Sequence, residues 1–170
     1  MIAPQRTRLE IRRASADDIA LIRSLADEAF RDTYREILSE GQLEYMLEWM
    51  YSEAALQRQM GAGHVYFIAE LDDTPCGYVS VQPLGLQDDG AYLFELQKIY
   101  VLPSFKGEGI GSALYGHISS FVKRISGRVS LPMHSVPLRS FSVRNAMNSS
   151  KTASVKRMGI WSSYSLSSSL

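Results

Sequence analysis

The chain has 170 residues, of which 45% are hydrophobic, so one domain can bury a full core without a disulfide or a metal ion. Its single cysteine, Cys76, excludes an internal disulfide and a cysteine-based zinc site. No stretch approaches the roughly 20 apolar residues of a membrane span, and the N-terminus lacks the apolar segment of a signal peptide, so we expect a soluble, cytoplasmic protein with no membrane partner.

The charges are distributed unevenly along the chain, although its net charge is zero. Residues 1–108 hold 18 acidic and 10 basic side chains, whereas residues 109–170 hold 8 basic and no acidic ones. Average usage would give the second segment about seven acids. A basic segment is one signature of binding to nucleic acid or to an acidic surface. We expect no nucleic-acid partner, because the end of the chain offers a different explanation of the imbalance.

The first third of the chain predicts a strand followed by two helical regions. The segment from Leu9 to Arg13 has the alternating apolar side chains of a short strand. Ser15, with two aspartates in the next turn, is a typical helix N-terminal cap. The apolar stripe of that helix consists of Ile19, Ile22, Leu25, Ala26 and Phe30. The second helical region covers about residues 40–60, with a break near Ser52.

Five apolar side chains of the second helical region have two interpretations. They are Met46, Leu47, Trp49, Met50 and Tyr51. An aromatic and methionine stripe can line a substrate groove, but at helical spacing it more often belongs to the core. We interpret the stripe as core and keep the groove as the alternative.

The middle of the chain predicts a sheet and one more helix. Residues 64–82 alternate as two antiparallel strands joined by a turn that contains Pro75. A longer strand covers residues 91–101, and a helix follows over residues 110–125. The apolar face of that helix consists of Ile110, Leu114, Ile118, Phe121, Val122 and Ile125. A last strand is predicted at about residues 128–133.

The segment between the long strand and the last helix is rich in glycine. It reads Lys106-Gly107-Glu108-Gly109-Ile110-Gly111. A strand, a glycine-rich turn and a helix N-terminus point several backbone N–H groups at one place, where the helix dipole favours negative charge. The order therefore predicts a phosphate cradle, with an ordinary tight turn as the alternative. A Walker loop would end in Gly-Lys-Ser/Thr, and a dinucleotide fingerprint would need an acid about 20 positions on, but no acid follows Glu108.

The run from Ile99 to Leu114 closely resembles the acetyl-CoA motif of the GNAT family of N-acetyltransferases. The family signature is Gln/Arg-x-x-Gly-x-Gly/Ala; Lys106 stands at its first position, and Gly109 and Gly111 are its glycines. The predicted elements over residues 8–133 also follow the order expected of this family. The resemblance implies an α/β fold in which helices flank a mixed, mostly antiparallel central sheet.

The resemblance further implies an enzyme that moves the acetyl group of acetyl-CoA directly to a primary amine, without a metal. Backbone groups of Ile99, Tyr100 and Val101 would bind the pantetheine arm like an additional strand. The loop that would hold the pyrophosphate consists of Lys106, Gly107, Glu108, Gly109, Ile110, Gly111 and Ser112.

A catalytic base is useful, because an amine must be neutral to attack a thioester. Glu95 lies six residues before Val101 and matches the position of the strand-borne glutamate base in the histone-acetylating members of the family. Alternation predicts that it shares one side of the strand with Gln97, Ile99 and Val101. A glutamate that merely pairs with a cation is the alternative.

No general acid or metal site is identified. Tyr100 and Tyr115 are interpreted as structural. The histidines His64, His117 and His134 lack the spacing of metal ligands, and each is interpreted as a surface or packing residue.

The family pattern stops near residue 133, so we predict an N-acetyltransferase domain over residues 1–133 and a Ser-rich basic tail over residues 134–170. The family normally continues with a helix that carries Asn…Ala…Phe-Tyr-Glu…Gly-Phe and a last strand. Reading the codons of Met147 to Val155 from their third bases forces a Glu and permits Phe-Phe-Glu-Asn-Gly-Phe-Arg. We hypothesise that the tail is a frameshift product, which would also explain the missing acids; a native Ser-rich tail is the alternative.

The partners are less well defined by the sequence. An acyl-CoA-binding module without catalysis and a tail that binds acidic partners are alternative functions. The acceptor is a small-molecule amine or a protein; the acidic front half would suit a polyamine-like cation, although such charges are more often a solvated face. These acids include Asp27, Glu28, Asp32, Glu36, Glu40, Glu44 and Glu48. Loss of a final strand would expose a sheet edge and favour a homodimer.

Overall fold

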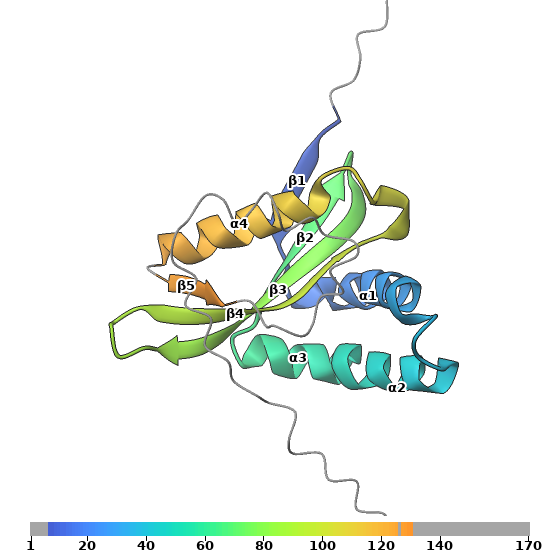
Figure 1. The fold of residues 1–170 in the computed structure, drawn as a ribbon, viewed down its shortest axis with the longest axis horizontal. Helices are drawn as coiled ribbons and strands as arrows, with labels where there is room; N and C mark the ends of the chain where they lie inside the picture. Colours follow the sequence, from blue (N-terminus) through green and yellow to red (C-terminus); the bar gives the residue numbers. More distant parts are fainter. Residues whose placement is uncertain (1–6, 126, 131–170) are drawn as a thin grey trace, which may run out of the picture.

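The computed structural model describes residues 7–125 and 127–130, and they form one five-stranded sheet with helices on both faces (Figure 1). The strands are β1 (Leu9–Arg13), β2 (Val65–Leu71), β3 (Thr74–Leu86), β4 (Tyr92–Val101) and β5 (Gly127–Ser130), in that spatial order. All neighbouring pairs are antiparallel except β4 and β5. The predicted α/β fold with a mixed, mostly antiparallel sheet is therefore confirmed, whereas the predicted tail over residues 134–170 lies outside the described residues.

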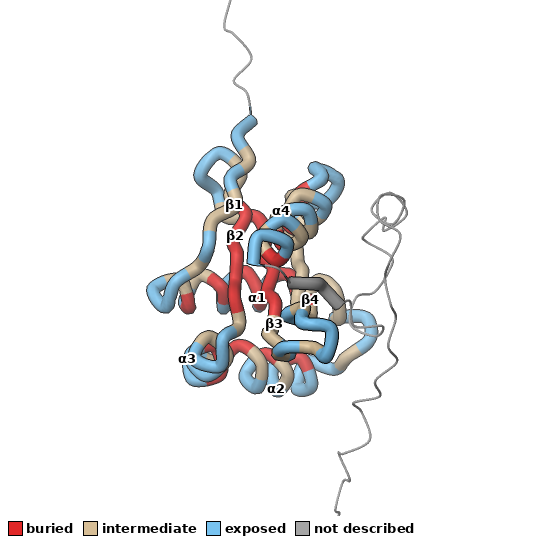
Figure 2. The backbone as a smooth tube through the Cα atoms, turned by 90° about the vertical axis from the view of Figure 1, so that its left-hand side faces the viewer, coloured by how far each residue is buried: buried red, intermediate tan, exposed pale blue. Residues whose placement is uncertain are grey.

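Each face of the sheet has its own helices and its own core. The helices α1 (Ile19–Tyr34), α2 (Glu40–Tyr51) and α3 (Glu53–Gly61) cover one face, which we call the α1–α3 face, and α4 (Ile110–Arg124) covers the α4 face (Figure 1). Side chains of β2 alternate between these faces, so Tyr66 and Ile68 join the first core while Phe67 joins the second. The buried residues follow the central strands and the inward sides of the helices (Figure 2).

The helix boundaries follow from capping side chains. The Ser15 hydroxyl accepts a hydrogen bond from the backbone of Asp17 and forms a capping box with Asp18, which starts a short 3-10 turn before α1. Ser52 ends α2 and caps α3 through the backbone N–H of Ala55, so the predicted break is confirmed. The predicted stripe of α1 is buried as expected.

The apolar stripe of α2 is divided between core and surface. Leu47 and Tyr51 are buried, and Met46 and Met50 pack partly against them. Trp49 is 53% exposed and lies outside the core. The core interpretation thus holds for four of the five side chains, because helical spacing turns the fifth toward solvent.

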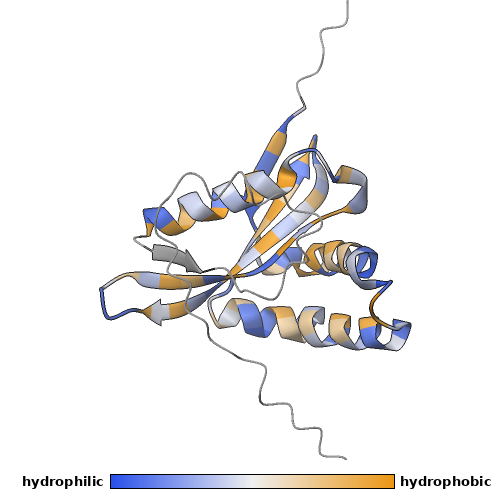
Figure 3. Cartoon of the chain, in the orientation of Figure 1, coloured by the Kyte–Doolittle hydropathy of each residue, from blue (hydrophilic) through white to orange (hydrophobic). Residues whose placement is uncertain are grey.

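Two details of the sheet region differ from the sequence predictions. Pro75, predicted in the turn, lies within β3, which begins at Thr74. The next residue, Cys76, is fully buried, and burial raises the pKa of its thiol. Ile125, predicted on the apolar face of the last helix, is 45% exposed, because α4 ends one residue before it. The turn between β3 and β4, residues 87–90, is hydrophilic (Figure 3). None of the helices over residues 7–125 is long and apolar enough to cross a bilayer.

Candidate active site

The glycine-rich segment forms a turn that opens directly into α4. Gly107 and Gly109 have φ angles of 94° and 76°, a left-handed conformation that costs glycine little. Gly109 is the N-cap of α4 and provides no side chain, so no side-chain hydrogen bond caps the helix. The first-turn N–H groups, residues 110–112, therefore point at the turn without an intrahelical partner, in the positive field of the helix dipole. This is the geometry of the predicted phosphate cradle; its cofactor role stays a prediction.

The charged side chains of this segment point elsewhere in the structure. Lys106 Nζ donates to a carboxylate oxygen of Asp32 on α1, and Asp32 also lies 3.8 Å from Arg35. Glu108 is exposed. The backbone of the segment, and not its charges, thus faces the cradle.

Within the described residues, one edge of β4 has no partner strand along half of its length. On this edge β5 pairs only with residues 92–95, through the register Tyr92↔Gly127 to Glu95↔Ser130. Beyond Glu95, no strand of the described residues pairs with this edge, although the other edge continues along β3 to Val101. The backbone of Ile99 to Val101 thus has no strand partner on this edge in the part of the chain that the structure describes, which suits pairing with an extended ligand in the way an additional strand would.

A β-bulge at Gln97 divides β4 into two halves. The register passes from Ser80↔Lys98 to Val81↔Leu96, so Gln97 has no partner on β3. The predicted alternation is therefore wrong. Ile99 and Val101 pack on the α4 face together with Leu96, which places Glu95 on the other side of the sheet.

Glu95 is half-buried on the α1–α3 face, and its nearest polar partner is on the same strand. Gln97 Nε2 donates a hydrogen bond to Glu95 Oε2. The ion pairs within the described residues do not include Glu95. The catalytic role of Glu95 and its alternative, pairing with a cation, therefore both stay predictions.

Lys98 is a feature of this site that the sequence analysis missed. Its Nζ donates hydrogen bonds to Gln59 Oε1 at 2.6 Å and to the Tyr66 hydroxyl at 2.8 Å. The same Nζ lies 4.8 Å from the ring centroid of Tyr51, and burial lowers the pKa of Lys98 to about 7. The sequence signal that could have identified this residue is a lysine in the middle of an otherwise apolar strand.

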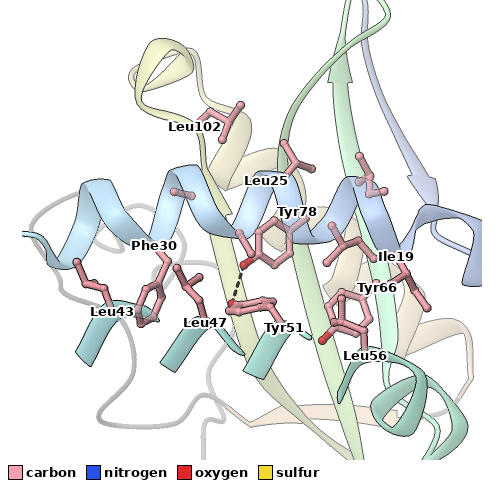
Figure 4. Close-up of a cluster of buried hydrophobic side chains, with 14 residues drawn as sticks. Ile19, Leu25, Phe30, Leu43, Leu47, Tyr51, Leu56, Tyr66, Tyr78 and Leu102 are labelled. Carbon is pink, nitrogen blue, oxygen red and sulfur yellow. Dashed lines mark hydrogen bonds between the residues drawn. The ribbon is translucent and has the colours of Figure 1, made fainter. Parts of the chain in front are cut away.

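Tyrosines line the α1–α3 face behind Lys98. The hydroxyls of Tyr51 and Tyr78 are hydrogen-bonded at 2.7 Å (Figure 4). Tyr78 also stacks on Tyr100 with ring centroids 5.7 Å apart. Burial raises the pKa of all three phenols. Tyr100 therefore packs within this cluster, and Tyr115 packs partly on the α4 face, as the structural interpretation predicted.

Most of the acids named in the front half lie on the outer side of the helical layer. A groove between α1 and α2 is lined by Arg23, Asp27, Glu28 and Arg31 of α1 and by Glu44 and Glu48 of α2, among others. The α1 positions in the groove are on the side of the helix opposite to its buried stripe. Several are ion-paired, including Asp27 with Arg31. These charges do not face the open edge of β4.

The described histidines pack at the periphery of the two cores. His117 lies edge-on against Phe67 with ring centroids 4.7 Å apart, and burial lowers its pKa. His64 Nδ1 is buried without a hydrogen-bond partner among the described residues. Within those residues no group of three His, Cys, Asp or Glu side chains could hold a metal ion.

Comparison with known proteins places this site in a family. A family model described as an acetyltransferase (GNAT) domain matches residues 62–148, just over half of the chain. The chain belongs to the GNAT acetyltransferase family.

Solved structures agree with this fold. The PaiA N-acetyltransferase from Thermoplasma acidophilum, in complex with coenzyme A, superimposes with a TM-score of 0.65 at 22% identity, over 83% of this chain and 86% of that chain. An aminoglycoside acetyltransferase from an uncultured soil metagenomic sample, in complex with sisomicin, gives 0.66 at 16% identity over 90% and 94%. The ribosomal-protein-alanine N-acetyltransferase from Brucella melitensis biovar Abortus 2308 gives 0.61 at 18% identity over 90% and 98%.

Proposed function

We propose that this protein transfers the acetyl group of acetyl-CoA to a primary amine. The observation that carries the proposal is the open edge of β4, which leads directly into the turn of Gly107 and Gly109 at the start of α4. Such an edge suits an extended pantetheine arm, and the turn suits a pyrophosphate. Family membership and the coenzyme A in a similar structure support the same assignment.

The reaction requires the protein to orient the two substrates and to remove a proton from the amine. The amine nitrogen forms a bond to the thioester carbon, and the bond from that carbon to sulfur breaks. The thiolate takes up a proton, and the amine loses one. In our proposal Glu95 accepts the amine proton, directly or through a water molecule, because it lies on the same strand just before the open edge. Gln97 holds the carboxylate through its side-chain amide.

The class of amine stays open between small molecules and proteins. The similar structures include an enzyme named for aminoglycosides and one named for a ribosomal protein. A cationic, polyamine-like acceptor remains our proposal for the small-molecule case. The acids of the groove between α1 and α2 give it little support, because Asp27 and Glu28 lie opposite the buried stripe of α1 and the two glutamates of α2 are exposed.

Calorimetric titration of the full chain with acetyl-CoA tests the cradle. Wild type should bind in the micromolar range, and Gly109→Val should bind at least about tenfold more weakly, since a β-branched residue is strained at φ 76° and would distort the first turn. The matched control is Gly90→Val, which imposes a similar strain at φ 79° in the distant turn between β3 and β4. Equal weakening by both variants, or no binding by folded wild type, contradicts the assignment.

Thiol release with a panel of amines tests the transfer itself. We expect turnover by wild type and a loss of about 100-fold or more in kcat with Glu95→Gln, which keeps the shape of the side chain but cannot accept the proton. Glu10→Gln, an exposed position on β1 at the far edge of the sheet from β4, is the matched control. Binding of acetyl-CoA without thiol release for any amine would favour the non-catalytic binding module.

A further inference from the structure

Lys98 has no part in the proposed transfer, yet its ammonium group makes two hydrogen bonds and two aromatic ring contacts on the α1–α3 face. It lies in the cross-strand row Tyr66, Ser80 and Lys98. Because Ser80 is small, the lysine reaches across β3 to the Tyr66 hydroxyl on β2. Its ammonium group also lies 5.3 Å from the Tyr66 ring centroid.

Packing alone does not require a charge at this position. No ion pair within the described residues includes Lys98, so only neutral oxygens and aromatic rings stabilise its ammonium group. Burying a cation this way is costly, and apolar replacements of buried ionic groups are often neutral or stabilising. The presence of a lysine at this position must therefore be explained by the elements that its hydrogen bonds connect.

Lys98 connects the sheet to the corner between α2 and α3. Gln59 Oε1 accepts hydrogen bonds from both Lys98 and Tyr66, and Gln59 Nε2 donates to the carbonyl of Met50 at 2.8 Å. Met50 is in the last turn of α2, and Ser52 is the residue shared by the two helix ends. An unbroken hydrogen-bond chain thus runs from β4 through α3 to the end of α2.

This corner and Glu95 lie on the same face of the sheet. An amine that reaches Glu95 must approach from the α1–α3 face, where the end of α2 and the start of α3 are packed. We propose that Lys98 is a positioning residue for the acceptor amine, because it holds the corner between α2 and α3 at a fixed place relative to the bulge of β4. The inference rests on the proposed function, since it presupposes that an amine is acetylated beside Glu95.

Lys98→Met is the first test, because methionine has a similar length and no charge. In thiol-release assays with a reactive amine, we expect the kcat/KM for the amine to fall at least about tenfold, mainly through KM, since the acceptor wall is displaced. The calorimetric Kd for acetyl-CoA should stay within about threefold of wild type, because the cradle does not depend on the corner. If Lys98 acted only through the stability of the fold, its substitution would not change the kcat/KM for the amine separately from the Kd for acetyl-CoA.

A double-mutant cycle identifies the path of the effect. Gln59→Leu should reproduce the loss, and combining it with Lys98→Met should add little, because both variants cut the same hydrogen-bond chain. Arg12→Met is the matched control; it removes a partly buried cation that is bonded to Asp18 and Glu70 and has no hydrogen bond to the corner, and it should leave the amine KM unchanged. If Lys98→Met does not fold, Gln59→Leu and Tyr66→Phe carry the same prediction.

Two results would overturn the inference in distinguishable ways. An unchanged amine KM in folded Lys98→Met and Gln59→Leu would show that Lys98 is a packing residue, while the proposed function stands. Absence of thiol release by wild type with every amine would remove the proposed function and the inference together.

Discussion

The two faces of the sheet bury similar numbers of side chains but of different kinds. The core of the α4 face is aliphatic and aromatic, with Val79, Val81 and Ile118 among its fully buried members. The core of the α1–α3 face contains tyrosines whose hydroxyls must find partners, and Lys98 and Gln59 lie at its margin. Both faces hold the sheet together, but among the described residues only the second carries a polar network.

This difference indicates a division of labour between the faces. An apolar core fixes positions by shape alone and tolerates no polar group without a partner. A buried network also fixes direction, because each hydrogen bond has a preferred angle, and it ties separate elements at specific atoms. The face beside Glu95 is the one that has such a network. The following changes should separate a stability role of the α4 face from a positioning role of the α1–α3 face.

The largest effect on stability is expected on the α4 face. Ile118→Ala removes a fully buried side chain from α4, so the free energy of unfolding should fall by about 2–5 kcal/mol. Acetyl transfer per folded molecule should not change, since no proposed site residue loses a contact. Urea unfolding with Ser120→Ala, an exposed neighbour on the same helix, as the control measures this. A loss below about 1 kcal/mol would mean that this core is loosely packed.

The pH dependence of stability should report on Lys98. Burial lowers its pKa to about 7, whereas an unfolded lysine titrates near 10.4. Between these values the unfolded chain holds a proton that the folded chain has released, so the free energy of unfolding should rise with pH. The slope is at most about 1.4 kcal/mol per pH unit, and we expect a total gain of about 1–3 kcal/mol between pH 7 and pH 9.5.

Lys98→Met should abolish that slope, which makes it the control for the same measurement. His64 and His117, whose pKa values burial also lowers, complete their contribution below this window, because unfolded histidine titrates near 6.5. Above about pH 10, unfolded tyrosines ionise while the buried ones resist, so stability should fall again. Cys76, whose pKa burial raises, acts in the opposite direction above about pH 8, where the unfolded thiol ionises. A difference between the wild-type and Lys98→Met curves that is flat between pH 7 and pH 9.5 would show that Lys98 keeps its ordinary pKa.

Much of the fold could be predicted because its signals are local. Ser15 and Ser52 cap helices through residues two or three positions away, and the stripe of α1 follows from helical spacing alone. The glycine turn was equally readable, since Gly107 and Gly109 adopt conformations that favour glycine. These features do not depend on the rest of the molecule.

The centre of the site could not be predicted because it depends on distant partners. The bulge at Gln97 lets Leu96 and Ile99, three positions apart, pack on the same face of the sheet, which strict alternation cannot describe. Lys98 finds its acceptors on Gln59 and Tyr66, 39 and 32 residues earlier in the chain. No local pattern links these three side chains.

A smaller effect is expected from the tyrosine pair. Tyr78→Phe removes one hydroxyl from the α1–α3 face and leaves the Tyr51 hydroxyl without its partner at 2.7 Å. The free energy of unfolding should fall by about 1–2 kcal/mol, and the reciprocal variant Tyr51→Phe should cost a similar amount. Thermal unfolding of both variants and of the double variant measures the pair. If the double variant is as destabilised as the sum of the two, the hydroxyls do not support one another.

The smallest effect is expected at the outer groove, between α1 and α2. This groove is lined by charged side chains, none of which is buried. Arg23 Nη2 lies 3.9 Å from Glu48 Oε2 across the groove, and both side chains are largely exposed. Water screens such a pair, so Arg23→Ala should change the free energy of unfolding by about 0.5 kcal/mol or less, and added salt should reduce the change further. Denaturant unfolding at low and high salt tests this. A larger loss of unfolding free energy that does not depend on salt would show that the ion pair holds α1 against α2. The outer side of the helical layer would then share the positioning role that we assign to its inner side.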